Sequence, residues 1–535
     1  MRKIRPILSL LLLVACPNLR AEPSLPRRLE NPLVLINAQG WAQYDLSIRG
    51  SSYTGVGLAI NGLNLKVPYS AHFNSELPFA GFQLSPAATQ YGLGNASGHL
   101  IGTATYTTPQ EKHLQMGAKL GTKEHYQAQI SAFSSGVGGF LEGEKARQID
   151  LDANNLDRYA GGAQLQYFIN DWQIDLIGSG QKKEFGAQGY YGMPTTAYAE
   201  QTTEDALVFL GATRGDLSDA YFRASAAGRQ FDDEIRGLTP HDVRSRFGAI
   251  ALEGRTMEIQ DIAINVRGDL ENEQVDGSVG SHDRTRASLL ILPEMRLEKM
   301  TLKAGVNSVF QTSEAAEFLP QLGLDWFTTD NSTLYISYSE TIQQPDYQTL
   351  ESNPYLQQQK SRNTELGFHQ FTSESFDWRA AAFYRQLENA SDWMGGTATD
   401  LGTLNIAGIE SELSFYPAET LELRAFYQWI HKDNSRTDGR YELDYPEHLL
   451  TFSGQWEFAP KFLLFAAQTL RLQTDNDART SSDFGADAAL GLHYLFAQHL
   501  RLSLLVDNLW DTNFQPLPGL PPPARTFSAG ITAIW

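Results

Sequence analysis

The chain ends on Phe527-Ser528-Ala529-Gly530-Ile531-Thr532-Ala533-Ile534-Trp535, and this stretch decides the fold. The residues that share one face are Phe527, Ala529, Ile531, Ala533 and Trp535. Because side chains alternate between the two faces of a strand, this face is apolar and ends on an aromatic residue at the free carboxylate. Such a face is an aggregation hazard in water, whereas in an outer-membrane β-barrel it meets lipid and its aromatic residues join the interfacial girdle. The tail therefore predicts a transmembrane β-barrel.

The composition agrees with a barrel. Of the 535 residues 42% are hydrophobic, and beyond the N-terminus no apolar run approaches the roughly 20 residues of a membrane-spanning helix. A helical membrane protein is thereby excluded. Aromatic residues make up 11% of the chain, with 22 Tyr and 9 Trp, which suits two interfacial girdles; an aromatic-rich soluble β-protein is the alternative. The net charge of −20 argues against a nucleic-acid partner and is compatible with an outer leaflet rich in divalent cations.

The N-terminus has the features of an export signal. Basic residues in the first five positions precede an apolar core at 7–15. A small-residue cleavage site ending at Ala21 predicts a signal peptide of residues 1–21 and a mature protein without cysteine. The alternative is a lipoprotein lipobox that ends at Cys16, the only cysteine of the chain. Cleavage after Ala21 is favoured, because a barrel seldom needs a lipid anchor.

From about residue 290 onward a hairpin unit repeats. Short polar turns are expected at Thr329-Asp330, Ser373-Glu374, Pro417-Ala418, Pro460-Lys461 and Gln498-His499. They recur about every 42 residues. Longer polar connections, such as 432–445 and 474–483, lie between them. Short turns on one side and long loops on the other are typical of an outer-membrane barrel, with the short side periplasmic.

The repeat gives a strand count. At about 40 residues per hairpin, residues 101–535 form about 11 hairpins, hence an all-β, antiparallel barrel of about 22 strands. Such a barrel encloses a lumen too wide for its own wall to fill, so it carries a plug. Residues 22–100, rich in Gly, Ser, Asn and Pro with short apolar strands, are expected to form this small plug domain.

The expected plug resembles that of TonB-dependent outer-membrane receptors. The resemblance begins with Asp-Leu-Ser-Ile-Arg-Gly-Ser-Ser at 45–52 and continues through Ile-Asn-Gly at 60–62, His-Phe-Asn at 72–74 and Leu-Pro at 77–78. The matching plug residues are Asp45, Ile48, Gly50, Asn61, Gly62, Tyr91 and Gly92. Their order and spacing match the second half of such a plug leading into the first barrel strand.

Two barrel segments also resemble this family. One runs from Tyr338 to Gly367 through Asn-Pro-Tyr-Leu at 353–356, and the other from Asp507 to Phe527 in the final hairpin. The terminal strand from Phe527 to Trp535 resembles the signal that the outer-membrane barrel assembly machinery reads. Four motifs in the right order make the resemblance specific from Asp45 to the C-terminus. It implies an outer-membrane location, with outer-membrane lipid and the assembly machinery as partners.

The expected plug departs from the family pattern in two places. Only about 25 residues separate the predicted cleavage site from Asp45, where the family has a TonB-contacting box and half a domain of α/β structure. The run Leu33 to Ile36 is either a degenerate box or, as we favour, a plug strand. The Arg-Gly-Pro turn expected before Tyr91 is replaced by Leu-Ser-Pro at 84–86. The plug is therefore predicted to be truncated, which puts energised transport in question and leaves the architecture intact.

Arg49 is the residue that we expect to carry a mechanism. By the resemblance, this arginine packs against acidic residues on the inner barrel wall, and Glu365 and Glu410 match the wall positions. A guanidinium in the lumen needs a carboxylate partner and can bind one bidentately. These three residues are expected to form a plug–barrel latch. The alternative is that each is a solvated charge without a specific partner.

No catalytic set is recognisable, and the chain is predicted not to be an enzyme. Its 11 His residues are scattered and none lies in a known catalytic frame. The spacing of Asp150, Asp152, Asn154 and Asp157 has part of a calcium-loop pattern, but Asn155 replaces the required Gly and Gly161 the required Glu. A hydrated acidic loop is favoured there. Neither a cofactor nor a metal is expected, and the tyrosines, such as Tyr190, are taken as girdle or loop residues first.

The function that the resemblance implies is uptake of a scarce, bulky small-molecule ligand, such as a cobalamin-like compound or a metal chelate of the siderophore type. Long extracellular loops and the plug apices would bind it, and TonB would supply energy from the inner membrane. The alternative is a non-energised relative that binds a ligand, forms a channel or serves a partner complex. The truncated N-terminus is the feature that separates these two functions.

Overall fold

The computed structural model describes residues 34–39, 42–74, 76, 78, 85–86, 90–91, 99–107, 112–147, 151, 154–217, 219–238, 240–372, 375–520 and 522–535. The predicted signal peptide, including Cys16 and Ala21, lies outside these residues, as do Leu33 and Gly92. Within the described residues, no helix has both the length and the apolar character needed to cross a membrane.

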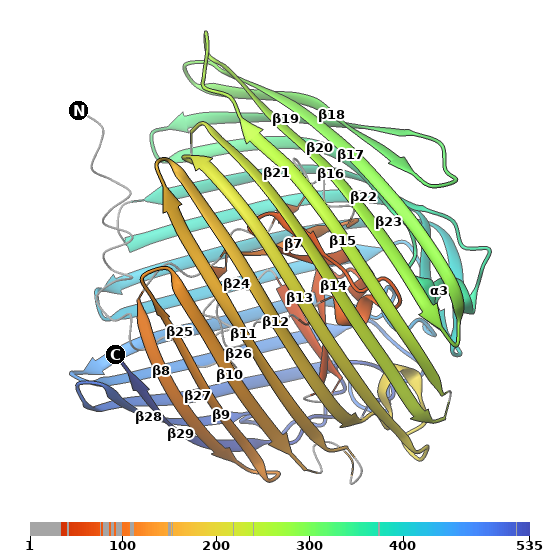
Figure 1. Cartoon of the computed structure of the whole chain (residues 1–535), viewed down its shortest axis with the longest axis vertical. Helices are drawn as coiled ribbons and strands as arrows, with labels where there is room; N and C mark the ends of the chain where they lie inside the picture. The colour runs from red at the N-terminus through yellow and green to blue at the C-terminus, as the bar shows by residue number, and fades with distance from the viewer. Residues whose placement is uncertain are drawn as a thin grey trace.

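A closed antiparallel barrel of 22 strands forms most of the structure (Figure 1). The first half comprises β8 (His113–Gly121), β9 (His125–Ser134), β10 (Val137–Ala146), β11 (Leu156–Ile169), β12 (Trp172–Gly186), β13 (Ala199–Gly215), β14 (Tyr221–Gly237), β15 (His241–Arg255), β16 (Ile262–Gly277), β17 (Gly280–Arg296) and β18 (Met300–Gln311). The second half comprises β19 (Glu317–Thr329), β20 (Ser332–Gln343), β21 (Gln359–Thr372), β22 (Phe376–Met394), β23 (Thr397–Ala418), β24 (Leu421–Lys432), β25 (Pro446–Ala459), β26 (Phe462–Gln473), β27 (Phe484–Ala497), β28 (Leu500–Asp507) and β29 (Thr526–Ile534). The predicted barrel of about 22 strands is confirmed.

Alternation along the strands separates the lumen from the outer face. In β13, Leu207 and Phe209 are 1% and 0% exposed, whereas Val208 and Leu210 between them are 55% and 49% exposed. A large apolar residue on an outward position would be an aggregation hazard in water, but it is the expected surface in lipid. The same alternation places charged and amide side chains in the lumen, where they meet one another and the plug.

The terminal strand closes the barrel. Strand β29 pairs antiparallel with β28 and with β8, so the last and first strands of the barrel form one continuous sheet. Trp535 continues this ladder by two backbone hydrogen bonds of 2.9 Å with Leu114. Its side chain and that of Phe527 are about half exposed on the outer face, in the positions that the alternation predicts.

The barrel wall differs in height around its circumference (Figure 1). At the seam, β28 and β29 have 8 and 9 residues, whereas β22 and β23 have 19 and 22. Roughly 10 residues suffice to cross a bilayer, so the long strands continue beyond it. Strands β22 and β23 are joined by Gly395-Gly396, both with positive φ (56° and 83°), as a two-residue hairpin turn requires.

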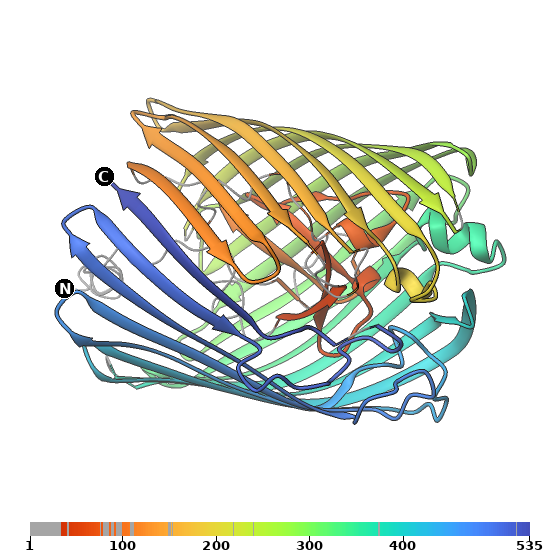
Figure 2. The same ribbon diagram turned by 90° about the horizontal axis from the view of Figure 1, so that it is seen from below.

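The plug occupies the lumen and is surrounded by barrel strands in both views (Figures 1 and 2). It contains a hairpin of β1 (Val34–Gln39) and β2 (Gln43–Ile48), and a second sheet made of β3 (Val56–Ile60), β4 (Leu63–Leu65), β5 (Ser85–Pro86), β6 (Gln90–Tyr91) and β7 (Gly102–Thr107). Short 3-10 turns lie at Tyr53–Gly55 and Ala71–Phe73.

The boundary between plug and barrel lies one strand later than the sequence suggested. Residue 101 was expected to open the barrel, but β7 pairs in parallel with β3 and antiparallel with β5 and β6, inside the lumen. The first barrel strand is β8, from His113. Apolar alternation is the same in both strands, so the sequence pattern alone does not tell a plug strand from a wall strand.

Short connections recur at one end of the barrel, as expected, and the other end carries the longest ones, although two of its turns, 278–279 and 395–396, also have only two residues. Two-residue turns follow β19, β23, β25 and β27, close to the predicted positions, while the turn after β21 includes residues 373 and 374, outside the described part. At the opposite end of the barrel lie the connections 344–358, which contains the helix α3 (Tyr347–Ser352), 433–445 and 474–483. By the length rule this second end is extracellular.

Candidate functional site

The tight turn that follows β2 is the centre of the site. Arg49 and Gly50 both have positive φ, 52° and 67°, and the amide of Ser51 donates to the carbonyl of Ile48 at 3.1 Å. A Cβ on Gly50 would lie 3.0 Å from the Cδ1 of Ile430 and 3.3 Å from the Cβ of Tyr445. Glycine is therefore required both by the backbone conformation and by the close approach of the wall.

Arg49 joins the plug to two strands of the wall. Its Nη1 lies 2.7 Å from Oε2 of Glu365 on β21, and its Nη2 lies 2.5 Å from Oε1 of Glu410 on β23. The Nε also donates to Glu410 at 3.0 Å, so that carboxylate is bound bidentately. The guanidinium lies 4.4 Å from the ring centroid of Phe383, and all three charged side chains are less than 10% exposed. The structure thus brings the three expected residues together as a buried ion cluster.

The next residues of the same turn contact the connection 433–445. The Nζ of Lys432 donates to the carbonyl of Gly50 at 2.8 Å and to Oε1 of Glu442 at 2.7 Å. The other oxygen of Glu442 accepts a 2.8 Å hydrogen bond from the amide of Ser52. Four consecutive plug residues therefore carry both the wall contact and the loop contact.

Aromatic rings stack at the extracellular apex of the plug. Tyr53 and His72 are stacked with ring centroids 3.7 Å apart, and Tyr441 from the connection 433–445 meets Tyr53 edge-on at 4.8 Å. The Nδ1 of His72 lies 2.9 and 3.0 Å from the two carboxylate oxygens of Asp45. Burial, followed by the nearby Asp346 carboxylate, raises the pKa of the Tyr53 hydroxyl well above its ordinary value. Burial likewise raises the pKa of Tyr441, to about 12.

Two buried polar contacts hold the connection 433–445 in place. Asp392 accepts hydrogen bonds from the amides of Tyr441 and Leu443, each at 2.9 Å. The Nη2 of Arg479 lies 2.5 Å from Oδ1 of Asp444, with both side chains fully buried. The connections after β24 and β26 therefore form one assembly over the apex, together with Leu517 and Leu520 from the last connection, which share an apolar cluster with Tyr53 and Tyr190.

The opposite wall contacts the plug with cations of its own. The Nζ of Lys183, on β12, lies 2.5 Å from Oε1 of Glu76 and donates to the carbonyl of Ala42. Arg229, on β14, donates to the carbonyls of Phe73 and Glu76 while pairing with Asp205 at 2.8 Å. These contacts fix the segment that follows the His-Phe-Asn motif.

The remaining motif residues lie at a third contact. Asn61 and Gly62 form the β3–β4 turn with positive φ, 46° and 82°, and the carbonyl of Asn61 accepts from Nη1 of Arg223 at 2.8 Å. Ile48 is fully buried, in the apolar cluster that also contains Ile430. Tyr91 pairs with Gly102 in the plug sheet. The motif residues are thus distributed over the plug rather than gathered at one point.

Comparison with known proteins identifies the architecture. Residues 97–509 match the family model described as TonB dependent receptor-like, beta-barrel. The chain belongs to the TonB-dependent receptor family. The family consists of outer-membrane barrels that act as transporters rather than enzymes, so the predicted location and the absence of an enzymatic role follow from membership.

Solved receptors share the fold at low identity. The FrpB iron transporter from Neisseria meningitidis (F3-3 variant) superposes with a TM-score of 0.76 at 12% identity, covering 96% of this chain and 97% of that one. The siderophore receptor PirA from Pseudomonas aeruginosa gives 0.74 at 13% identity, covering 96% and 97%. The copper transporter OprC gives 0.76 at 13% identity, covering 94% of each chain. At such identities the likeness establishes the fold.

Two residues of the partial calcium-loop pattern, Asn154 and Asp157, make hydrogen bonds and ion pairs within the protein. Asn154 exchanges hydrogen bonds with the backbone of Gln188, and Asp157 pairs with Lys145 and Arg147 at 3.0 and 2.9 Å. Asp150 and Asp152 lie outside the described residues, so the pattern as a whole is not visible. Over the described ranges, no group of three or more His, Cys, Asp or Glu is placed to hold a metal ion.

Several contact residues of the receptor were not singled out from the sequence. Lys183 lies in Gln-Lys-Lys-Glu, where polar residues fall on both faces of the strand, so the alternation gives no inward signal. Asp392, Asp444 and Arg479 act through contacts between loops far apart in the chain. Arg229 lies in Gly-Arg-Gln-Phe-Asp-Asp, where polar residues also fall on both faces of the strand, so the alternation gives no inward signal there either.

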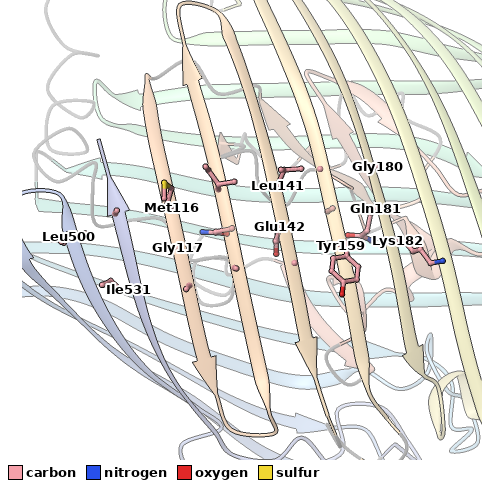
Figure 3. Close-up of a pocket in the computed structure, with 18 residues that line it drawn as sticks. Met116, Gly117, Leu141, Glu142, Tyr159, Gly180, Gln181, Lys182, Leu500 and Ile531 are labelled. Atoms are coloured by element: carbon pink, nitrogen blue, oxygen red, sulfur yellow. The ribbon is translucent and has the colours of Figure 1, made fainter.

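A hollow of about 860 Å³ lies on the outer wall of the receptor beside the seam (Figure 3). Ala118, Ala128 and Gly143 form a cross-strand row of small outward residues over β8, β9 and β10. Met116 and Leu141 flank this row and are 45% and 66% exposed. The hollow therefore belongs to the lipid-facing surface and is separate from the lumen.

Proposed function

We propose that the chain is an uptake receptor for a scarce, bulky small molecule, such as a metal chelate of the siderophore type or a cobalamin-like compound, energised by TonB. Family membership supports transport. The structural relatives include an iron transporter, a copper transporter and a siderophore receptor, which favours a metal-containing cargo. The outer-membrane barrel assembly machinery and lipid are its expected partners during biogenesis.

The observation that carries the proposal is the latch of Arg49 with Glu365 and Glu410. It is a buried ion cluster that crosses the boundary between plug and wall. Removing one partner from a buried ion pair costs several kcal/mol, so cargo passage past this plug requires work. An external source of energy is the simplest supply, and TonB provides it in this family.

The second candidate is a receptor that is not energised. The observation in its favour is that Val34, Leu35 and Ile36 pair with β2 as part of the plug hairpin. TonB recruits its receptors by pairing with an extended segment, and backbone groups already bonded within the plug are unavailable for that purpose.

Uptake in cells with and without TonB tests the proposal. Cells expressing the chain should accumulate a labelled ferric chelate or cobalamin from a panel only when TonB is present. Accumulation that is independent of TonB would establish the second candidate, and no accumulation of any compound would argue against an uptake receptor.

The variant Leu35→Pro sharpens this test. Proline removes a backbone donor, so we expect it to disturb the β1–β2 hairpin and plug folding rather than energisation alone. A variant that folds and binds its cargo normally but no longer accumulates it would instead establish the segment as a working TonB box. The control is a proline at an exposed loop position away from the plug, Ala315→Pro in the connection between β18 and β19, which should leave both folding and accumulation unchanged.

A further inference from the structure

A small, partly open cavity lies beside Tyr441 of the connection 433–445, at the apex of the plug. Its volume is about 20 Å³, enough for one group of the size of a water molecule. The plug contributes Ser52 and Tyr53, α3 and the residue before it contribute Thr349 and Asp346, and β22 contributes Asp392. The cavity is therefore built from three parts of the molecule that are far apart in the chain.

The hydroxyl of Tyr53 is the unusual feature of this cavity. Tyr53 is 5% exposed, and within the described part of the chain its Oη has no hydrogen-bond partner. A buried hydroxyl without a partner loses its hydration and gains nothing in return, at a cost comparable to a lost hydrogen bond. A ligand group or an ordered water in the cavity would satisfy it.

The charge of the lining is one-sided. Its charged members are the two carboxylates, Asp346 and Asp392, and no Lys, Arg or His of the described residues lines it. Asp346 accepts from the amides of Thr349 and Ala71, and Asp392 accepts from three backbone amides. Amide dipoles stabilise a carboxylate but do not neutralise it, so the cavity remains favourable to a cation.

Aromatic rings complete the lining. Tyr53, Tyr441 and Trp393 all border the cavity, although one face of the Tyr53 ring is covered by His72. Two carboxylates and a free hydroxyl match one protonated amino group, which supplies donors, positive charge and the right size. A carboxylate, catecholate or phosphate would meet like charge there.

We propose that this cavity binds a single protonated amino group, and that a cargo carrying such a group places it against Tyr53 Oη beside Tyr441. The inference rests on the proposed uptake function only in assigning the amino group to a cargo; the cation site itself does not depend on transport. It goes beyond that function by naming the chemistry that the apex recognises.

Methylammonium chloride is the probe, titrated into the purified full-length protein in detergent while the fluorescence of Trp393 is followed. Tetramethylammonium chloride, which is larger and has no N–H donor, and sodium formate, an anion, are matched controls at equal ionic strength. Because methylammonium has two heavy atoms, the expected dissociation constant is millimolar at best, on the order of 5 to 10 mM. The signal should disappear in Trp393→Phe.

The variant Tyr53→Phe removes the hydroxyl and keeps the ring. Because a hydrogen bond to a charged group contributes substantially to binding, methylammonium should bind Tyr53→Phe about tenfold or more weakly than it binds the unaltered protein. Tyr347→Phe is the matched control, since the Tyr347 hydroxyl is also buried without a partner among the described residues but does not line the cavity. Its affinity for methylammonium should be unchanged.

The inference is overturned if formate or tetramethylammonium binds as well as methylammonium, if Tyr53→Phe binds normally, or if no saturable binding occurs and the cavity holds water only. Measuring uptake by cells in parallel separates the two claims. Accumulation of a chelate without methylammonium binding would support the uptake function and refute the cation site. Methylammonium binding without accumulation of any compound would support the cation site and refute the uptake function.

Discussion

The two walls on either side of the plug hold it with opposite polarity. On the β21–β23 side the plug supplies the cation, Arg49, and the wall supplies the carboxylates of Glu365 and Glu410. On the β12–β14 side the wall supplies the cations, Lys183 and Arg229, and the plug supplies one carboxylate and several carbonyls. The first contact therefore places two wall carboxylates around the one cation of the plug, with Arg385 of β22 as a further wall cation near them. The second contact distributes two wall cations over one plug carboxylate and several weaker carbonyl acceptors.

This difference predicts which contact dominates. Losing Arg49 leaves two buried carboxylates without their partner in the plug, and the cation that remains near them is the buried Arg385 of the wall strand β22. Losing one cation of the second contact leaves the other wall cation bonded to the plug. The plug should therefore be fixed most firmly at the turn that also contacts the connection 433–445, and held more loosely on the far side.

The largest effect is expected for Arg49→Ala. Breaking a buried ion pair by removing one partner should lower the free energy of plug opening by about 3 to 5 kcal/mol. Amide hydrogen exchange of the plug measures that free energy, and conductance in planar bilayers should rise as the plug loosens. Unchanged exchange and conductance would mean that the three residues are independent solvated charges.

Lys183→Met tests the opposite wall. It should lower the free energy of plug opening by about 3 kcal/mol, less than Arg49→Ala does, because one carboxylate rather than two loses its partner. Methionine keeps the length of the side chain, so packing against Phe185 and Phe73 is largely retained. Hydrogen exchange of residues around Glu76 reports the change. An effect greater than that of Arg49→Ala would reverse the ranking of the two walls.

Lys66→Ala should have a smaller effect, about 1 kcal/mol, measured in the same exchange experiment. Lys66 pairs with Glu271 at 2.7 Å but is 14% exposed, and the carboxylates of Glu271 and Glu273 retain Arg286 and Arg284 after its removal. If Lys66→Ala lowered the free energy of plug opening as much as Arg49→Ala does, the burial of the cation would not determine the strength of a contact.

The smallest expected quantity is the coupling between the two walls. The hydrogen bonds given above for Arg49 and for Lys183 go to different residues. The loss of stability in the double variant Arg49→Ala/Lys183→Met should therefore equal the sum of the losses in the single variants within about 0.5 kcal/mol. A double-mutant cycle in hydrogen exchange gives this number. A coupling well above that value would mean that the plug moves as one rigid unit and that the two contacts are not separate.

The sequence by itself determined the barrel. A side-chain period of two, repeated over hundreds of residues, is compatible with few folds other than a large β-barrel. It gave the strand number from the hairpin length, the closing strand from Phe527–Trp535 and, through a resemblance, the three residues of the Arg49 cluster. Strand alternation is a local property, because it can be recognised from neighbouring residues alone. Family motifs carry non-local information only where a motif happens to be present.

The tertiary structure decided everything that depends on contacts between distant segments. It assigned β7 to the plug, where β7 pairs with β3. The sequences of these strands do not show whether β7 pairs with β3 or with β8. It brought Lys183 to Glu76 and Arg479 to Asp444, pairs separated by 107 and 35 residues. It also placed Tyr53, Asp346 and Asp392 around one small cavity. Ion pairs and cavities depend on where closure of the barrel places each wall position around the plug, and that placement is a property of the whole fold.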